Sequence, residues 1–150
     1  MTELSHDIST LNSLIATTLD SVEGYTEAAK NTENTGFVTP FNGLAGERRQ
    51  LVSHLQQHVS SLGGEPEDDG TILAGAHRVF LNLKSVVTGH DGKAIINKVK
   101  SGEDHIKAKY EDALEDRELS SAVQTLVASA YTSVKAGHDE IRYIKHSMEL

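Results

Sequence analysis

The chain has 150 residues, with 22 acidic and 14 basic side chains, and its formal net charge is -8 at pH 7. This length is typical of one domain with a substantial buried core. The acidic balance argues against a nucleic-acid-binding surface, because phosphate contacts need clustered lysines and arginines. The absence of cysteine excludes disulfides, iron–sulfur clusters and thiol catalysis. No apolar run approaches the roughly 20 residues of a membrane span, and no signal peptide is visible. We therefore expect a cytoplasmic protein without a membrane span.

The first predicted helix begins near Leu4 and continues to Ala29. Its apolar residues recur at alternating steps of four and three, with Thr18 filling one gap in the series. This spacing is typical of the buried seam of a bundle helix and predicts about seven turns. Asparagine, threonine, glycine and proline in residues 31–40 then end the helix.

The second predicted helix spans Pro40 to Leu62. Thr39 is the expected N-cap, with proline at the first helical position. Gly63 and Gly64 end the helix. The predicted buried seam contains Leu44, Glu47, Leu51, His54 or Leu55, His58 and Leu62.

Three further segments follow the helical period: a short one from Thr71 to Thr88, a longer one from Lys93 to Glu115, and a last one from Leu119 to near the C-terminus. Ser120 and Ser121 are alternative caps of the last segment. No strand-like alternation and no linker divides the chain, so residues 1–150 are predicted to form one domain. The predicted fold is an all-α, ferritin-like antiparallel four-helix bundle, with the short segment as an extra helix in the crossover.

Three polar residues lie on or beside the predicted apolar seams of different helices. They are Glu47, Glu103 and His138. A bundle core tolerates charge only where the charge is paired or bound to a metal. These three side chains are therefore the candidate site, and the three helices could bring them into one layer.

Several stretches resemble a known family of proteins. Gly102-Glu103 followed by Tyr110, Tyr25 followed by Ala29, and residues 45–50 resemble parts of rubrerythrin-type ferritins. The whole chain resembles more closely a family of short, uncharacterised ferritin-like bacterial proteins, a domain-of-unknown-function family. That resemblance rests on Asp20 to Tyr25, Gly63 to Pro66, His77-Arg78 with Asn82 to Lys84, Gly102 to Asp104, and His138 to Ile141.

The resemblance to ferritins implies a di-metal carboxylate site of which only half is present. Such a bundle takes one Glu from each of two helices and a Glu-x-x-His pair from each of the other two. Glu47, Glu103 and His138 match this pattern. Thr18, Gln50 and Lys135 stand at the other three ligand positions.

Three interpretations of this degenerate site stay open. In the first, the Lys135 ammonium replaces the lost cation and pairs with Glu47 or Glu103, with Gln50 and Thr18 completing the hydrogen bonds. In the second, the polar side chains lie at the edges of the seams with their charged groups in water. In the third, Glu47, Glu103 and His138 bind a single transition-metal ion; otherwise no cofactor is expected.

The resemblance favours a non-enzymatic bacterial protein with a binding or stress-related interaction role. Its expected partner is another protein or a second copy of the chain, and nucleic acid is not expected. The alternative is a protein that binds iron, manganese or zinc, or a weak oxidoreductase, through Glu47, Glu103 and His138. A third class is an amphipathic module at a membrane surface, although the net charge of -8 opposes binding to anionic lipids.

Overall fold

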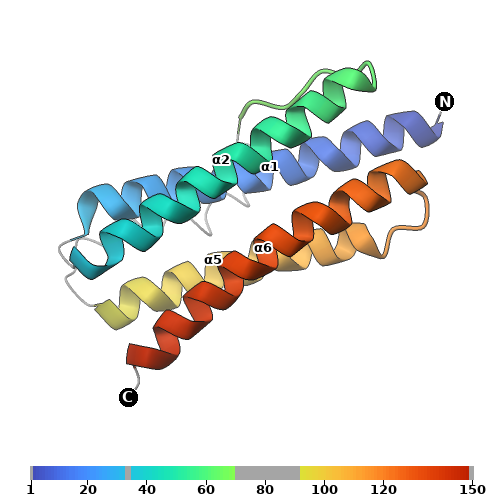
Figure 1. The fold of residues 1–150 in the computed structure, drawn as a ribbon. Helices are drawn as coiled ribbons and strands as arrows, with labels where there is room; N and C mark the ends of the chain where they lie inside the picture. The colour runs from blue at the N-terminus through green and yellow to red at the C-terminus, as the bar shows by residue number, and fades with distance from the viewer. Residues whose placement is uncertain (1, 33–34, 70–91, 149–150) are drawn as a thin grey trace.

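The computed structural model describes residues 2–32, 35–69 and 92–148, and within them it contains four long helices and no strand. The helices are α1 (Thr2–Asn31), α2 (Val38–Ser61), α5 (Gly92–Leu114) and α6 (Ser121–Met148), with a short 3-10 turn, η1 (Thr35–Phe37), before α2. The predicted all-α four-helix bundle is confirmed (Figure 1). The predicted crossover helix from Thr71 to Thr88 lies outside the described residues.

The helices form two antiparallel pairs. α1 packs against α2, α5 packs against α6, and α1 also contacts α5. Helices α2 and α5 run in the same direction, and the first turns of α1 lie at the same end of the bundle as the turn between α5 and α6 (Figure 1). This arrangement brings the start of the chain beside a segment more than a hundred residues later.

The apolar core consists of two clusters, one toward each end of the bundle. One cluster includes Leu11, Ile15, Leu55, Ile106, Tyr110, Val123 and Val134, and the other includes Tyr25, Phe41, Leu44, Ile95, Val99 and Ile141. Each large apolar side chain buried in them contributes about 1.5–3 kcal/mol. Every helix passes from one cluster to the other, and buried polar residues lie at that transition: Thr18, Ser21, Arg48, Glu103 and His138. The core is therefore interrupted near its middle by a polar layer.

The start of α2 differs from the prediction. The helix begins at Val38, and its N-cap is Phe37, which makes no side-chain capping hydrogen bond. Phe37 is buried and stacks on Phe41 with the ring centroids 5.2 Å apart. The 3-10 turn leads directly into α2, so Thr39 lies within the first turn and the predicted Thr39 cap is wrong. Pro40 is tolerated because first-turn amides have no intrahelical acceptor.

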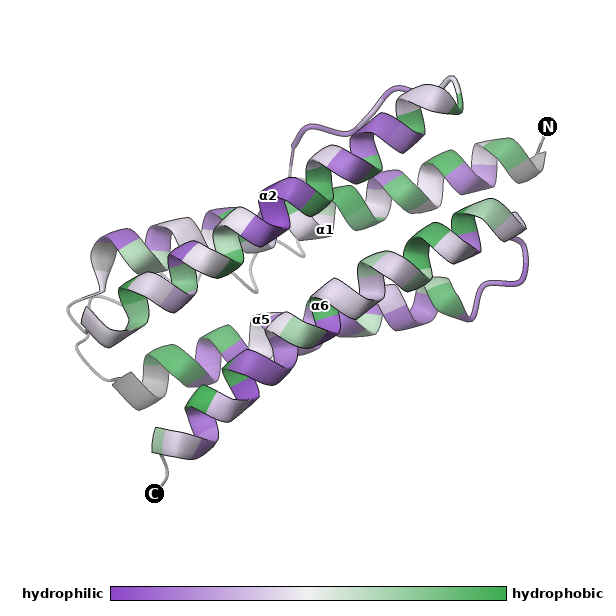
Figure 2. Cartoon of the chain, viewed as in Figure 1, coloured by the Kyte–Doolittle hydropathy of each residue, from purple (hydrophilic) through white to green (hydrophobic). Residues whose placement is uncertain are grey.

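The other helix ends follow the predicted signals. The end of α2 at Ser61 precedes Gly63, which has φ +85° and thus needs glycine. The Ser120 hydroxyl accepts a hydrogen bond from the Val123 amide at 3.3 Å, which is the geometry of an N-cap for α6. The segment after α2 and the turn between α5 and α6 are strongly hydrophilic (Figure 2).

The buried seam of α2 also differs from the prediction at one position. Glu47 is exposed, whereas Arg48 is completely buried. The seam proceeds from Leu44 by a step of four to Arg48 and then to Leu51 and Val52. Steps of three and four are equally compatible with a helical seam, so spacing alone did not decide between adjacent residues of opposite charge.

Candidate functional site

An ion pair between Arg48 of α2 and Glu103 of α5 occupies the centre of the polar layer. The two terminal guanidinium nitrogens of Arg48 donate to different carboxylate oxygens of Glu103, at 3.0 Å and 2.8 Å. The side chains are 1% and 0% exposed. This bidentate geometry is the strongest form of the arginine–carboxylate interaction. The pair joins the two helical hairpins of the bundle.

Two residues of α1 complete the hydrogen bonding of this pair. The Tyr25 hydroxyl donates to Glu103 Oε2 at 2.7 Å. The Ser21 hydroxyl accepts from Arg48 Nη1 at 3.0 Å. Both residues are buried. Because a buried ion pair is tolerable only when additional hydrogen bonds satisfy its polar atoms, Ser21 and Tyr25 are part of the same structural unit.

A second hydrogen bond in the core links α1 to α5. The Thr18 hydroxyl donates to the Leu14 carbonyl at 2.7 Å and lies 2.8 Å from the Tyr110 hydroxyl. Burial raises the pKa of Tyr110 to about 12. Thr18, which stands where the ferritin resemblance implies a carboxylate ligand, therefore serves as the partner of a neutral phenol.

Gly137 of α6 provides the space that the guanidinium occupies. A Cβ atom at this position would lie 2.5 Å from Arg48 Nη2 and 2.9 Å from Leu44 Cδ2. Both distances are far below van der Waals contact. A larger residue at position 137 would therefore force the Arg48 guanidinium and the Leu44 side chain to move.

The charges of this layer stabilise one another. Burial disfavours the charged guanidinium, but the Glu103 carboxylate outweighs this cost and raises the pKa of Arg48 above its usual value. Burial and the adjacent Glu103 raise the pKa of Tyr25 well above its usual value, so this phenol keeps its proton. Tyr25 is therefore fixed as a hydrogen-bond donor, and it has no role as a general base at neutral pH.

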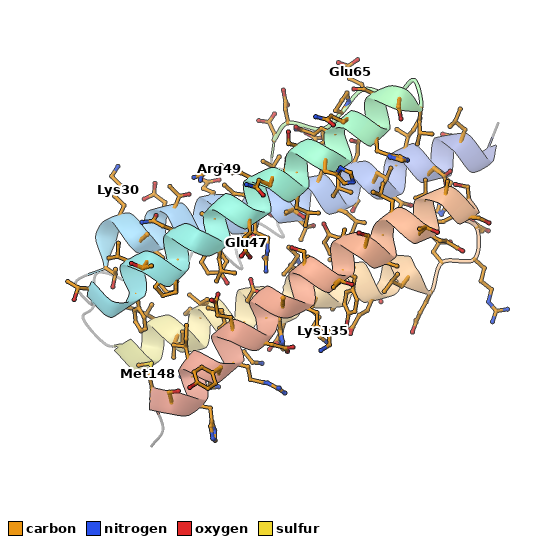
Figure 3. All side chains as sticks on the ribbon, viewed as in Figure 1. Lys30, Glu47, Arg49, Glu65, Lys135 and Met148 are labelled. Carbon is orange, nitrogen blue, oxygen red and sulfur yellow. The ribbon has the colours of Figure 1, made fainter. Side chains whose placement is uncertain are left out.

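The predicted pairing of Lys135 with a core carboxylate is wrong. The Lys135 ammonium lies 3.1 Å from Asp139 Oδ2, one turn further along α6, and its side chain is 53% exposed. Figure 3 shows Lys135 on α6 and Glu47 on α2. Arg48 holds the position that we expected Lys135 to take, because it follows Leu44 by one full turn on the inner face of α2. Gln50 is exposed and is no part of the layer.

The three predicted metal ligands differ in their surroundings. Glu103 is bound to Arg48, and Glu47 is exposed. His138 is largely buried, and its Nε2 lies 2.7 Å from Asp104 Oδ1. Among the described residues, two groups of three metal-ligating side chains have donor atoms within 4.8 Å of one another. Neither group contains any of the three predicted ligands.

Glu140 of α6 has a shifted pKa that depends in part on the nearby Glu47. Partial desolvation, followed by the nearby carboxylates of Glu47 and Glu103, raises the pKa of Glu140. The Arg48 guanidinium is the neighbouring cation that opposes this shift. Both oxygens of Glu103 are already engaged by Arg48.

The fold and this site define a class of protein: a four-helix bundle whose central polar layer holds an internal arginine–glutamate pair. Within the described residues, no helix has both the length and the apolar character that crossing a membrane requires. The chain belongs to the family described as Domain of unknown function (DUF2383), which matches residues 6–116. The match confirms the predicted domain-of-unknown-function family. No curated protein matches the chain.

Proposed function

We propose that this chain is a non-enzymatic bundle protein in which Arg48 takes the place of a metal cation, and that it acts by binding another protein or a second copy of itself. The observation that carries this proposal is the bidentate Arg48–Glu103 pair with both side chains at most 1% exposed. A metal ion at Glu103 would have to displace the guanidinium. The displaced charge would then be buried without a partner, which costs several kcal/mol, about 3–5.

The outer face of α6 supports a role in binding. Tyr143 is 73% exposed and is one of two large hydrophobic side chains exposed among the described residues. It borders a hollow of about 390 Å³, together with Asp139, Arg142 and His146 of the same helix. Tyrosine and arginine are enriched in protein–protein interfaces relative to other surfaces. We include in the proposed binding function the stress-related interaction role that the family resemblance suggests.

The competing function is binding of iron, manganese or zinc, or weak oxidoreductase activity, by Glu47, Glu103 and His138. The charges of Glu47 and Glu103 contribute to the raised pKa of Glu140, and this grouping of acidic side chains favours a cation in the region. The engagement of Glu103 by Arg48 and of His138 by Asp104 opposes it.

The metal content of the interior tests the two functions against each other. Untagged protein is incubated anaerobically with Fe²⁺ or Mn²⁺, desalted, and analysed by inductively coupled plasma mass spectrometry. We expect the native protein, Glu47→Gln and His138→Gln to hold the same amount of metal, because none of the interior side chains would contribute a ligand. Near-stoichiometric metal that is lost in Glu47→Gln and in His138→Gln would establish the competing function instead.

Self-association tests the binding part of the proposal. Sedimentation velocity over a range of concentrations should reveal a reversible oligomer that Tyr143→Ser weakens and that Arg117→Ser, a change at another exposed position, leaves intact. A chain that stays monomeric directs the search to a different protein partner. In that case, a photo-crosslinker at position 143 should give adducts in cells that the same group at position 117 does not give.

A further inference from the structure

We propose that the end of the bundle where α1 begins and α5 meets α6 is a binding site for a divalent transition-metal ion, with Zn²⁺ as the best match. The ligands are His6, Asp116 and Glu118, whose donor atoms lie within 4.8 Å of one another. This site is separate from the central polar layer, and it requires no change in the Arg48–Glu103 pair.

The donor atoms suit zinc. His6 Nε2 lies 2.6 Å from Asp116 Oδ2, and Glu118 adds a second carboxylate from the same turn. One imidazole nitrogen and two carboxylate oxygens are among the donors that Zn²⁺ prefers, and three protein ligands leave the fourth tetrahedral position to water. A hard cation such as Mg²⁺ prefers oxygen donors alone, so the histidine selects a transition metal.

Contacts outside the three ligands hold the two parts of the site together. The Asp7 carboxylate, which is nearly completely buried, accepts a hydrogen bond from the Ser120 amide at 3.0 Å. Gln124 of α6 donates to the Asp116 carbonyl at 3.1 Å. The first bond holds the start of α1 against the turn between α5 and α6, and the second holds that turn against α6. The fold thus reduces the cost of ordering the ligands of a metal site.

The site is also accessible. The side chains of His6 and Asp116 are 34% and 26% exposed, and Asp116 borders an open groove of about 320 Å³ between α1 and α5. Zinc lies about 2.0–2.2 Å from nitrogen and oxygen ligands. The ion would replace the direct His6–Asp116 hydrogen bond, and the two partly exposed side chains have room to separate by the small distance required.

The second group of metal-ligating side chains provides a useful contrast. Glu67, Asp68 and Asp69 are consecutive in the loop after α2 and offer only carboxylates. We do not propose that this group binds zinc, because it has no nitrogen donor and no ligand from another helix. It serves as an internal comparison for the experiment.

A bound ion at the proposed site would join residues that are 110 positions apart in the sequence. Because the unfolded chain does not hold these ligands together, binding would favour the folded state. Zinc should therefore raise the midpoint of thermal unfolding, and the increase should depend on zinc concentration.

The experiment uses the full chain without a histidine tag, freed of metal with EDTA. Calorimetric titration with ZnCl₂ should give one ion per chain, and ¹⁵N NMR should show shifts at the amides near residues 6 and 116–118. His6→Ala and Glu118→Gln should each weaken binding by at least about tenfold, since even supporting residues of metal sites have effects of that size. His54→Ala, which removes an exposed histidine of α2, should leave the affinity unchanged.

Glu118→Gln keeps the His6–Asp116 bond, so it tests the site even if His6→Ala fails to fold. Absence of binding, or equal affinity in the native protein and Glu118→Gln, would overturn the proposal. Zinc-induced shifts confined to residues 67–69 would overturn it as well. Shifts confined to the surroundings of Glu47, Glu103 and His138 would contradict both this site and the proposed function, whereas binding at the bundle end with an unperturbed interior supports both.

Discussion

The bundle contains a buried ion pair and an exposed one, each formed by a basic and an acidic side chain. Arg48 and Glu103 come from different helices and are completely buried, with two parallel hydrogen bonds and further partners on α1. Lys135 and Asp139 are one turn apart on the same helix, and both are well exposed to water. Burial makes the loss of either partner of the first pair costly, while solvent screening leaves the second pair with little effect on stability.

The largest expected effect of a single substitution follows from this contrast. Arg48→Met keeps much of the side-chain volume but leaves the Glu103 carboxylate buried without its cation. The free energy of unfolding should fall by about 3–5 kcal/mol, as it does when one partner of a buried pair is removed. Urea denaturation followed by circular dichroism measures the change.

The double substitution Arg48→Met/Glu103→Leu is the matched control. Replacing both charges with apolar groups is often neutral or stabilising, so the double variant should recover most of the loss. The resulting coupling energy separates the ion pair from packing. If Arg48→Met alone costs less than about 1 kcal/mol, water reaches Glu103 and the pair is in effect a surface pair.

A smaller effect is expected at Gly137, where α6 makes room for the guanidinium. In Gly137→Ala the added methyl would lie 2.5 Å from Arg48 Nη2. Overpacking of this kind costs about 1–3 kcal/mol, against a gain of about 0.5–1 kcal/mol for removing glycine from a helix. Urea denaturation should show a net loss of stability, and the loss should shrink when Arg48 is already methionine.

Gly46→Ala provides the control for helix propensity. Gly46 lies in α2 with nothing within 4 Å of the position of a Cβ atom. The substitution should therefore stabilise the protein by about 0.5–1 kcal/mol. Equal effects of Gly46→Ala and Gly137→Ala would show that the α6 glycine has no role in accommodating Arg48.

The pattern of buried residues explains how far the sequence could predict this molecule. The apolar spacing predicted the four long helices and the inner face of α5, where it left Gly102 or Glu103 as the seam residue between Val99 and Ile106. The fold buries both of these residues. On α2, Glu47, Arg48 and Arg49 are consecutive charges, and periodicity permits either of the first two on the seam. Our prediction placed Glu47 on the seam, three residues after Leu44, whereas the fold buries Arg48.

The partner of Glu103 was beyond prediction for a different reason. Which cation meets a carboxylate across a bundle depends on the rotation of each helix about its own axis. A shift of one residue on α2 turns a side chain by about 100°, which exchanges an exposed acid for a buried base. Gly137 was the one local indication of a buried arginine. A glycine on the apolar inner face of α6 leaves space that a large side chain of a neighbouring helix can fill.

The pH dependence of stability extends the comparison to a single half-buried histidine, His105 of α5. Burial, with a smaller contribution from Lys109, lowers the pKa of His105 below 6.5, although Asp20 opposes the shift. The unfolded state therefore binds a proton more readily than the folded state. The stabilising contribution of neutral His105 is present above pH 6.5 and is lost as the pH falls from there through the lowered pKa.

The His105→Gln variant tests this contribution. Urea denaturation between pH 8 and pH 5 should show that acidification destabilises the native protein more than the variant. His54→Gln, on the exposed face of α2, should follow the native protein over the same range. A steeper loss in His105→Gln than in the native protein would contradict the sign derived from burial.

The smallest effect is expected at Lys135, the residue that the ferritin resemblance marked as the replacement for a metal ligand. Its pairing with Asp139 is exposed and lies within one helix, and such pairs contribute about 0.3–0.5 kcal/mol. Lys135→Ala should change the free energy of unfolding by no more than that. Lys135→Glu, which would restore the Glu-x-x-His spacing with His138, should bind no more iron or manganese than the native protein, because its carboxylate would point into water while Arg48 stays at Glu103.

A loss above about 1 kcal/mol in Lys135→Ala would require a desolvated pair. Metal uptake specific to Lys135→Glu would mean that position 135 can reach the core. Either result would remove the distinction between the surface pair and the buried one.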